Sequence, residues 1–161
     1  MRFSTTRKPL CIGVAEASLC LAFPPADDEV KSLPDGPGKE ATTRVCLDCH
    51  GTGNFRKDRR PREDWADQVA EMVDRGAKGS EKDMAAIVEY LTQNFGPDSK
   101  VNVNTAPLIE LKTVLGLTTQ EARAVIEYRD TNGGFKAWSD LQKVAGVDGK
   151  KIEGKKDLMA F

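Results

Sequence analysis

Apolar residues between positions 61 and 95 recur every three or four residues, the spacing that gathers them on one face of a helix. This pattern predicts two amphipathic helices, preceded by a shorter helix at about residues 41–49. The last of the three begins after Ser80, an N-cap candidate with Asp83 three residues later, as in a capping box. It ends before Gly96, because the Gly-Pro pair there does not continue a helix. We predict one small helical unit in residues 41–97.

A different pattern fills residues 98–161 and repeats itself once. The segment LKTVLGLTTQEARAVIEYR predicts a short helix, a turn centred on Gly116 and a longer helix. The segment WSDLQKVAGVDGKKIEGKKDLMAF repeats that plan around Gly146, and TNGGF joins the two. We interpret the repeat as two helix-hairpin-helix units. No alternating strand pattern of useful length occurs, so the expected fold class is all-α.

The first 26 residues are predicted to be a signal peptide. Basic residues precede an apolar run from Leu10 to Phe23, which is too short for a membrane span. Cleavage near Ala22 or Ala26 would place the chain in the periplasm of a bacterium or outside the cell, with no integral membrane span. The alternative is an N-terminal helix that is not cleaved. The polar stretch 27–40, which contains Pro and Gly, is expected to be a flexible lead-in.

Composition and charge narrow the function classes. Of the 161 residues, 39% are hydrophobic and 30% are charged, which is typical of a folded globular protein. The net charge of -1 excludes an overall basic bias towards nucleic acid. The charge is unevenly spread: residues 45–99 have 8 basic and 11 acidic side chains, net -3, whereas residues 100–161 have 10 and 8, net +2. Aromatic residues are only 6%, so a large buried cofactor would help the first unit to fold.

The stretch VCLDCH, residues 45–50, carries the most specific chemical signal. A structural zinc site needs four ligands, but without the leader Cys46 and Cys49 are the only cysteines, and His50 is the only histidine. A redox-active dithiol belongs in a thioredoxin-like βαβ setting, whereas the flanking pattern is helical. Covalent haem c suits the spacing, because the thiols reach both vinyl groups and the imidazole binds iron from one side. We expect one covalent haem c.

The lone histidine leaves the second axial position of the iron to another residue. A methionine thioether there would raise the redox potential and suit electron transfer. Met72 is the first candidate, because it shares a helix face with Trp65 and Val69, and Met84 is the alternative. An open or water-bound iron remains an option, and a methionine on a helix can also simply fill the core.

Five basic residues lie within seven positions of the same unit: Arg56, Lys57, Arg59, Arg60 and Arg62. Such a cluster can pair with haem propionates or form a docking patch for an acidic redox partner. It can equally be a solvated loop. The sequence leaves these interpretations open.

The pattern CLDCH…RR…W…V..M…GA…YL.NFG, over about residues 41–96, resembles small class I-like cytochrome c modules. Such modules occur alone or fused in bacterial periplasmic proteins, including those beside quinone-cofactor dehydrogenases. The resemblance implies that Cys46 and Cys49 hold the haem and that His50 and Met72 bind its iron. It implies a carrier of single electrons rather than an enzyme, with a redox partner protein such as a periplasmic dehydrogenase.

The second unit has turns of the kind that bind phosphate. A helix-hairpin-helix turn presents backbone N–H groups at the start of a helix, where the helix dipole also attracts an anion. The candidates are Gly116, Leu117 and Thr118 in the first turn, and Gly146, Val147, Gly149, Lys150 and Lys151 in the second. Through N.NTA, A..VIEYR, GGF and DL..V.G, residues 101–161 resemble the ComEA-type competence DNA receptor domain. The resemblance implies binding of double-stranded DNA outside the cytoplasmic membrane through the two hairpins.

The sequence departs from that family where phosphate would bind. The family turn has the pattern Gly-apolar-Gly, whereas Thr118 and Asp148 stand at the final position here. Thr118 can still donate a hydrogen bond, but Asp148 should repel phosphate unless Gly149 shifts the turn. Our main hypothesis is a periplasmic monohaem cytochrome whose second module tethers it to DNA or to a protein. The alternative is a ComEA-like DNA-binding protein whose haem is structural or senses redox state or small ligands.

Overall fold

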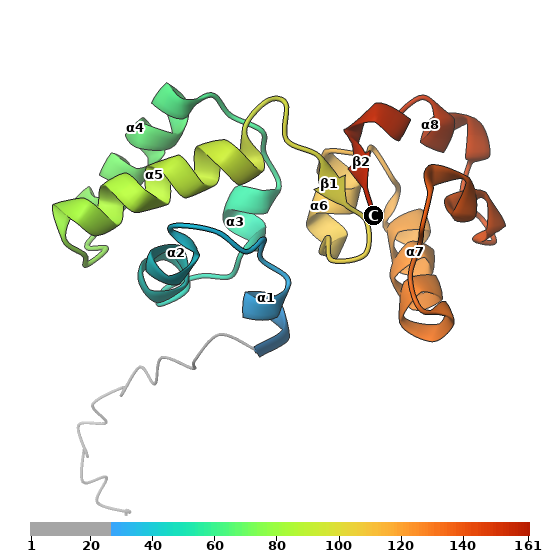
Figure 1. Cartoon of the computed structure of the whole chain (residues 1–161), viewed down its shortest axis with the longest axis horizontal. Coiled ribbons are helices and arrows are strands. Elements are labelled where there is room, and N and C mark those ends of the chain that lie inside the picture. The colour runs from blue at the N-terminus through green and yellow to red at the C-terminus, as the bar shows by residue number, and fades with distance from the viewer. Residues whose placement is uncertain (1–26) are drawn as a thin grey trace, which may run out of the picture.

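The structure is a computed structural model that describes residues 27–161. The predicted signal peptide, with Cys11 and Cys20, lies outside the described residues. The chain is mostly helical (Figure 1). In order, the elements are α1 (Asp27–Lys31), α2 (Lys39–Cys46), α3 (Gly53–Arg56), α4 (Arg62–Asp74), α5 (Glu81–Phe95), β1 (Val101–Asn102), α6 (Leu108–Thr113), α7 (Thr119–Asn132), the 3-10 helix η1 (Trp138–Lys143), α8 (Gly149–Glu153), the 3-10 helix η2 (Lys156–Leu158) and β2 (Met159–Ala160).

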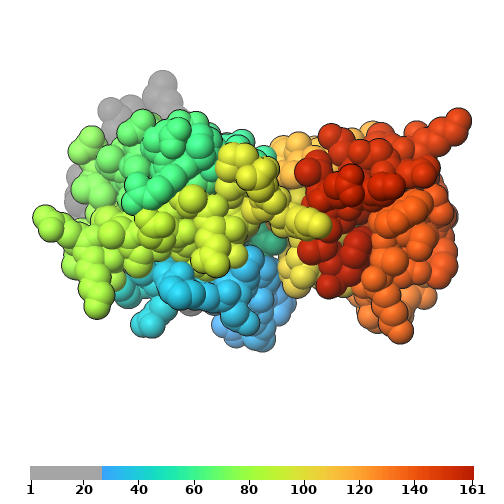
Figure 2. Space-filling model, turned by 45° about the horizontal axis from the view of Figure 1, so that its top comes forward, coloured from blue at the N-terminus to red at the C-terminus, as the bar shows by residue number. Residues whose placement is uncertain are grey.

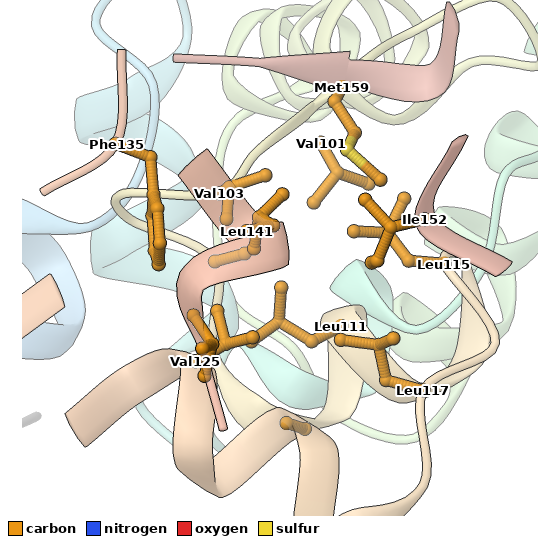
Figure 3. Close-up of a cluster of buried hydrophobic side chains, with 13 residues drawn as sticks. Val101, Val103, Leu111, Leu115, Leu117, Val125, Phe135, Leu141, Ile152 and Met159 are labelled. Carbon is orange, nitrogen blue, oxygen red and sulfur yellow. The ribbon is translucent and has the colours of Figure 1, made fainter. Parts of the chain in front are cut away.

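Two separate hydrophobic cores divide the chain. The first lies among α2, α4 and α5 and is built around Trp65, Ile87, Tyr90 and Phe95, each at most 1% exposed. The second core is formed by α6, α7, η1, α8 and both strands. The buried apolar side chains of these elements point towards one another (Figure 3). We call residues 27–95 the pocket lobe and residues 101–161 the hairpin lobe. The two lobes adjoin each other in the space-filling view (Figure 2).

The helices of the pocket lobe confirm the periodic pattern. The apolar stripes of α4 and α5 pack against each other, and α5 also packs against α2. At the start of α5, Ser80 and Asp83 form the predicted capping box, in which each side chain accepts a hydrogen bond from the other residue's backbone N–H. The first helix starts and ends earlier than predicted, because α2 begins at Lys39 and ends at Cys46, and the motif continues into a turn.

The prediction of a flexible lead-in at residues 27–40 is wrong. Leu33 is 3% exposed and belongs to the first core, so burial of its apolar side chain holds this stretch against the lobe. The Tyr90 hydroxyl donates a hydrogen bond to the Pro34 carbonyl at 2.7 Å, and the Lys39 ammonium donates one to the Leu33 carbonyl at 2.8 Å. Val30 and Leu33 both pack on this core, but two apolar residues in a polar stretch are too few to give a periodic signal in the sequence.

The hairpin lobe is closed by a pair of strands that an all-α prediction omits. β1 pairs in parallel with β2, so that Val101 lies opposite Met159 and Asn102 opposite Ala160. The pairing joins the beginning and the end of the lobe (Figure 1). Each strand has two residues, too few for an alternating pattern to be visible in the sequence.

A buried ion-pair cluster joins the two lobes. Glu110 of α6 is 2% exposed and accepts hydrogen bonds from Arg56 Nε at 2.7 Å and from Arg59 Nη2 at 2.6 Å. Arg56, itself 2% exposed, also donates to the backbone carbonyls of Ser32 and Thr105. Because these contacts come from both lobes, the cluster fixes α3 against α6.

Among the described residues, no helix is both long enough and apolar enough to cross a membrane.

Candidate functional sites

The motif residues of the pocket lobe line a single cavity of about 470 Å³. Cys46 is the last residue of α2, and Cys49 and His50 lie in the turn that follows. Met72 of α4 and Met84 of α5 line the same cavity. The structure therefore brings together every pocket residue that the sequence singled out, and it places both methionines at the site.

The rest of the cavity wall is mainly apolar. Trp65 and Val69 come from α4, and Ile87 and Leu91 come from α5. These side chains are also members of the first hydrophobic core, so the cavity opens directly onto that core. An apolar wall with a few polar groups is typical of a cofactor site.

The hydrogen bonding of His50 suits a metal ligand. Its Nδ1 atom lies 3.2 Å from the Gly51 carbonyl oxygen. In the tautomer with a proton on Nδ1, this ring nitrogen donates to the carbonyl and leaves Nε2 with a free lone pair. A hydrogen bond from the ring nitrogen that does not bind the metal is the usual way in which a protein orients a metal-binding imidazole.

The Cys46 thiol lacks the properties of a reactive cysteine. Burial raises the pKa of Cys46 to about 11, so the thiol stays protonated at neutral pH. Cysteines of redox-active dithiols instead have lowered pKa values and sit near positive charge. This environment disfavours the dithiol interpretation of the motif.

The basic cluster of the pocket lobe divides between the cavity and the lobe junction, except for Arg62, which pairs with Glu89 on the surface. Lys57 and Arg60 line the cavity. The Arg60 guanidinium lies over the Trp65 ring, 5.5 Å from its centroid, and pairs with Asp58 at 2.7 Å. Arg56 and Arg59 instead hold Glu110 between the lobes, a structural use that none of the sequence interpretations included.

The first hairpin turn runs from α6 into α7 through Gly116, Leu117 and Thr118. Gly116 has φ 73°, a left-handed conformation that favours glycine. Leu117 is buried, and its N–H donates to the Leu111 carbonyl, so this residue supports the turn from inside. The Thr118 hydroxyl caps α7 by accepting from the N–H of Glu121 at 3.2 Å.

The second hairpin turn runs from η1 into α8. Gly146 has φ 85°, which repeats the geometry of the first turn, and Val147 follows it. The N-cap of α8 is Asp148, whose carboxylate accepts hydrogen bonds from the N–H groups of Lys150 at 2.9 Å and Lys151 at 3.4 Å. Protein groups therefore already occupy two of the backbone donors expected to meet phosphate.

Glu121 ties the two hairpins together, and our sequence predictions missed it. Its buried carboxylate accepts hydrogen bonds from the N–H of Thr118 at 2.7 Å and of Asp148 at 3.3 Å, and from Lys151 Nζ at 2.9 Å. The Lys151 ammonium and the Thr118 N–H lower the pKa of Glu121 to about 2, so it is ionised at neutral pH. The spacing Thr118-x-x-Glu121 is that of a capping box and could have revealed the local contact.

The two lysine candidates consequently differ. Lys150 is exposed, whereas the ammonium group of Lys151 is paired with Glu121. Lys150 is the one with an ammonium group available to a phosphate, and Lys151 holds the two hairpins together.

Several residues of the ComEA-type sequence pattern have structural roles in the hairpin lobe. Asn104 accepts from the N–H of Phe135 at 2.7 Å and donates to its carbonyl at 2.9 Å. Arg129 donates to the carbonyls of Val103 and Ala106 at 2.9 and 2.8 Å. Gly134 has φ 89°, and a Cβ there would lie 2.9 Å from the Asn104 side chain. These signature residues hold the fold together and do not themselves define a ligand.

Comparison with known proteins finds a family match for the hairpin lobe. Residues 96–158 match the family described as "Helix-hairpin-helix motif", so they form a helix-hairpin-helix domain. Residues 27–95 lie outside that match. No solved structure matches the chain significantly.

Several curated proteins are similar over the same region. ComE operon protein 1 of Bacillus subtilis is 41% identical over 58 residues, which are 36% of this chain and 28% of that protein. Endonuclease/exonuclease/phosphatase family domain-containing protein 1 of Homo sapiens is 46% identical over 54 residues, 34% of this chain and 10% of that protein. An uncharacterized protein of Haemophilus influenzae is 32% identical over 63 residues, 38% of this chain and 56% of that protein. Each likeness therefore covers only part of the relative's length.

Proposed function

We propose that the helix-hairpin-helix domain binds the phosphate backbone of double-stranded DNA without sequence preference. The observation that carries this proposal is the first hairpin turn, in which a left-handed Gly116 leads into the N-terminus of the 14-residue helix α7. Thr119 and Gln120 open that helix and are exposed. Their N–H groups have no partner within the helix and form the positive end of the helix dipole. The resemblance to ComEA-type DNA receptors supports the same function.

Charge near the second hairpin also favours a polyanion. Lys150, Lys155 and Lys156 lie at α8 and just after it, and Lys150 and Lys156 are exposed. This domain has a net charge of +2 while the other unit is acidic, so a duplex is attracted to the hairpin lobe rather than to the pocket lobe. Phosphate contacts of this kind give affinity that falls steeply with salt.

Binding of a random-sequence duplex, followed by fluorescence anisotropy at several salt concentrations, tests this function. We expect Lys150→Ala to weaken binding about threefold and to reduce the salt slope by about 0.9, the value for one lost phosphate contact. Lys82→Ala, an exposed lysine of α5 in the other lobe, is the matched control and should change neither quantity. Equal affinity and slope for wild type and K150A would contradict a role for Lys150.

We propose a second function for the pocket lobe, which is to hold one covalent haem c and to pass single electrons to a partner protein. The observation that favours it is the gathering of two thiols, one imidazole and two thioethers around one apolar cavity. The donor set fits the cofactor: Cys46 and Cys49 would hold the porphyrin, and His50 would bind the iron through Nε2. When bound, the group supplies a one-electron iron couple.

Other residues of the lobe would position that cofactor. Lys57 and Arg60 line the cavity and would pair with its carboxylates. Ile87 and Leu91 would exclude water from the iron, so that water would not compete with a protein side chain for the metal. A signal peptide at residues 1–26, as the sequence predicts, would deliver the chain to the periplasm or beyond, with a redox protein such as a dehydrogenase as partner.

The methionine that completes the iron site can be identified from spin state. We propose Met72, so Met72→Ala is expected to convert the ferrous protein from low spin to high spin. Met84→Ala is the matched control, because it removes the same side chain from the same cavity and should leave the spectrum low-spin. The reverse pattern would assign the position to Met84. A high-spin wild-type spectrum would argue against either methionine and towards ligand sensing.

A further inference from the structure

We propose that Asp148 closes the backbone N–H groups of the second hairpin to phosphate, so that the first hairpin alone binds a duplex through backbone N–H groups and the second contributes only the side-chain charge of Lys150. This inference rests on the proposed DNA binding and adds a residue that determines how many hairpins bind through backbone N–H groups. It differs from what the ComEA-type resemblance implies, in which both hairpins bind.

The closure is visible in the hydrogen bonds at the start of α8. The Asp148 carboxylate accepts from the N–H groups of Lys150 and Lys151, and the Asp148 carbonyl accepts from the N–H of Ile152. Of the first four N–H groups of α8, only that of Gly149 has no partner among the described residues. A phosphate would have to displace a carboxylate that is already bound to the same donors.

The first hairpin differs from the second in the charge of its helix cap and in how many of its backbone N–H groups are already bound. Its cap is the neutral hydroxyl of Thr118, which accepts only from the N–H of Glu121. The carboxylate of Glu121 is turned inward, where Lys151 neutralises it. The N–H groups of Thr119 and Gln120 have no partner among the described residues, and both residues are exposed. A phosphate can therefore approach this helix end without meeting an anionic cap.

A pair of proline substitutions tests each hairpin with the same chemical change. Proline is favoured at the first position of a helix, where it removes an N–H that has no helical partner. The residues that precede the two sites, Thr118 and Asp148, already have the extended backbone that proline requires. Thr119→Pro should weaken duplex binding about tenfold, whereas Gly149→Pro should leave it within about twofold of wild type. Unchanged thermal unfolding shows that each variant remains folded.

Substitutions of Asp148 test the closure itself. Asp148→Gly frees two N–H groups and should tighten binding about tenfold, with a salt slope steeper by about 0.9 for each phosphate gained. Asp148→Asn keeps a capping side chain while removing the charge, and should tighten binding by less. Glu127→Gln is the charge-matched control, because this exposed residue lies eight positions, or about 12 Å, along α7 from its first residue.

The outcomes separate the inference from the proposed function. If wild type binds DNA and Gly149→Pro weakens binding as much as Thr119→Pro, the second hairpin is open and the inference is wrong. Wild-type affinity in both Asp148 variants would also overturn it. Binding by Asp148→Gly alone would support the closure of the second hairpin but would contradict binding by the first hairpin. If neither wild type nor any variant binds a duplex at low salt, the proposed DNA binding itself fails, and the inference fails with it.

Discussion

Glu110→Ala is expected to lower the free energy of unfolding by about 3–5 kcal/mol, the usual cost of breaking a buried ion pair from one side. The substitution leaves the guanidinium groups of Arg56 and Arg59 without their carboxylate, and these side chains are only 2% and 11% exposed. Urea denaturation measures the change. We further expect the single transition of wild type to separate into two, because the buried cluster is the main polar contact between the lobes.

A surface ion pair of the same lobe provides the control for this prediction. Arg62 and Glu89 are paired at 2.6 Å, but their side chains are 59% and 62% exposed. Arg62→Ala should therefore change stability by less than about 1 kcal/mol. A loss that is equally small for Glu110→Ala would mean that the junction between the lobes does not depend on this cluster.

Replacing both Cys46 and Cys49 by alanine is expected to abolish covalent haem attachment. These residues would supply the two thioether bonds that the proposed function requires, and both line the cavity. Haem staining after a denaturing gel measures attachment, because only covalently held haem migrates with the chain. The wild-type chain, produced with haem-maturation factors, should stain, and the double variant should not.

The leader cysteines make a matched control for that experiment. Cys11→Ala combined with Cys20→Ala removes the same number of thiols from the precursor, in the leader that is expected to be cleaved and not in the motif. This variant should stain like wild type. Staining of the Cys46 and Cys49 double variant, or its absence in wild type, would contradict covalent attachment at this motif.

The sequence predicted the parts of the structure that depend on local patterns. The stripes of α4 and α5 and the capping box at Ser80 follow from spacing alone. The structure also brings Cys46, His50 and Met72 to one cavity, which the motif and α4 line together.

The features that the sequence missed depend on contacts between distant residues. Glu110 is an ordinary glutamate in a short helix, and its burial requires two arginines from more than 50 positions earlier. Of the neighbouring basic residues, some line the cavity and others lie at the junction between the lobes. No local sequence pattern distinguishes the two groups. Asp148 was recognised as a departure, but its bonds to the α8 amides became clear only from the turn geometry.

The most direct test of the account is gel filtration of the purified holoprotein with a short random duplex, followed at the haem absorbance band and at the DNA absorbance band. We predict that the haem absorbance moves to the position of the DNA at low salt and returns to that of the free protein at high salt. A red protein that elutes apart from the duplex at low salt would contradict DNA binding. Protein without haem absorbance that co-elutes with the duplex would contradict the proposed haem site.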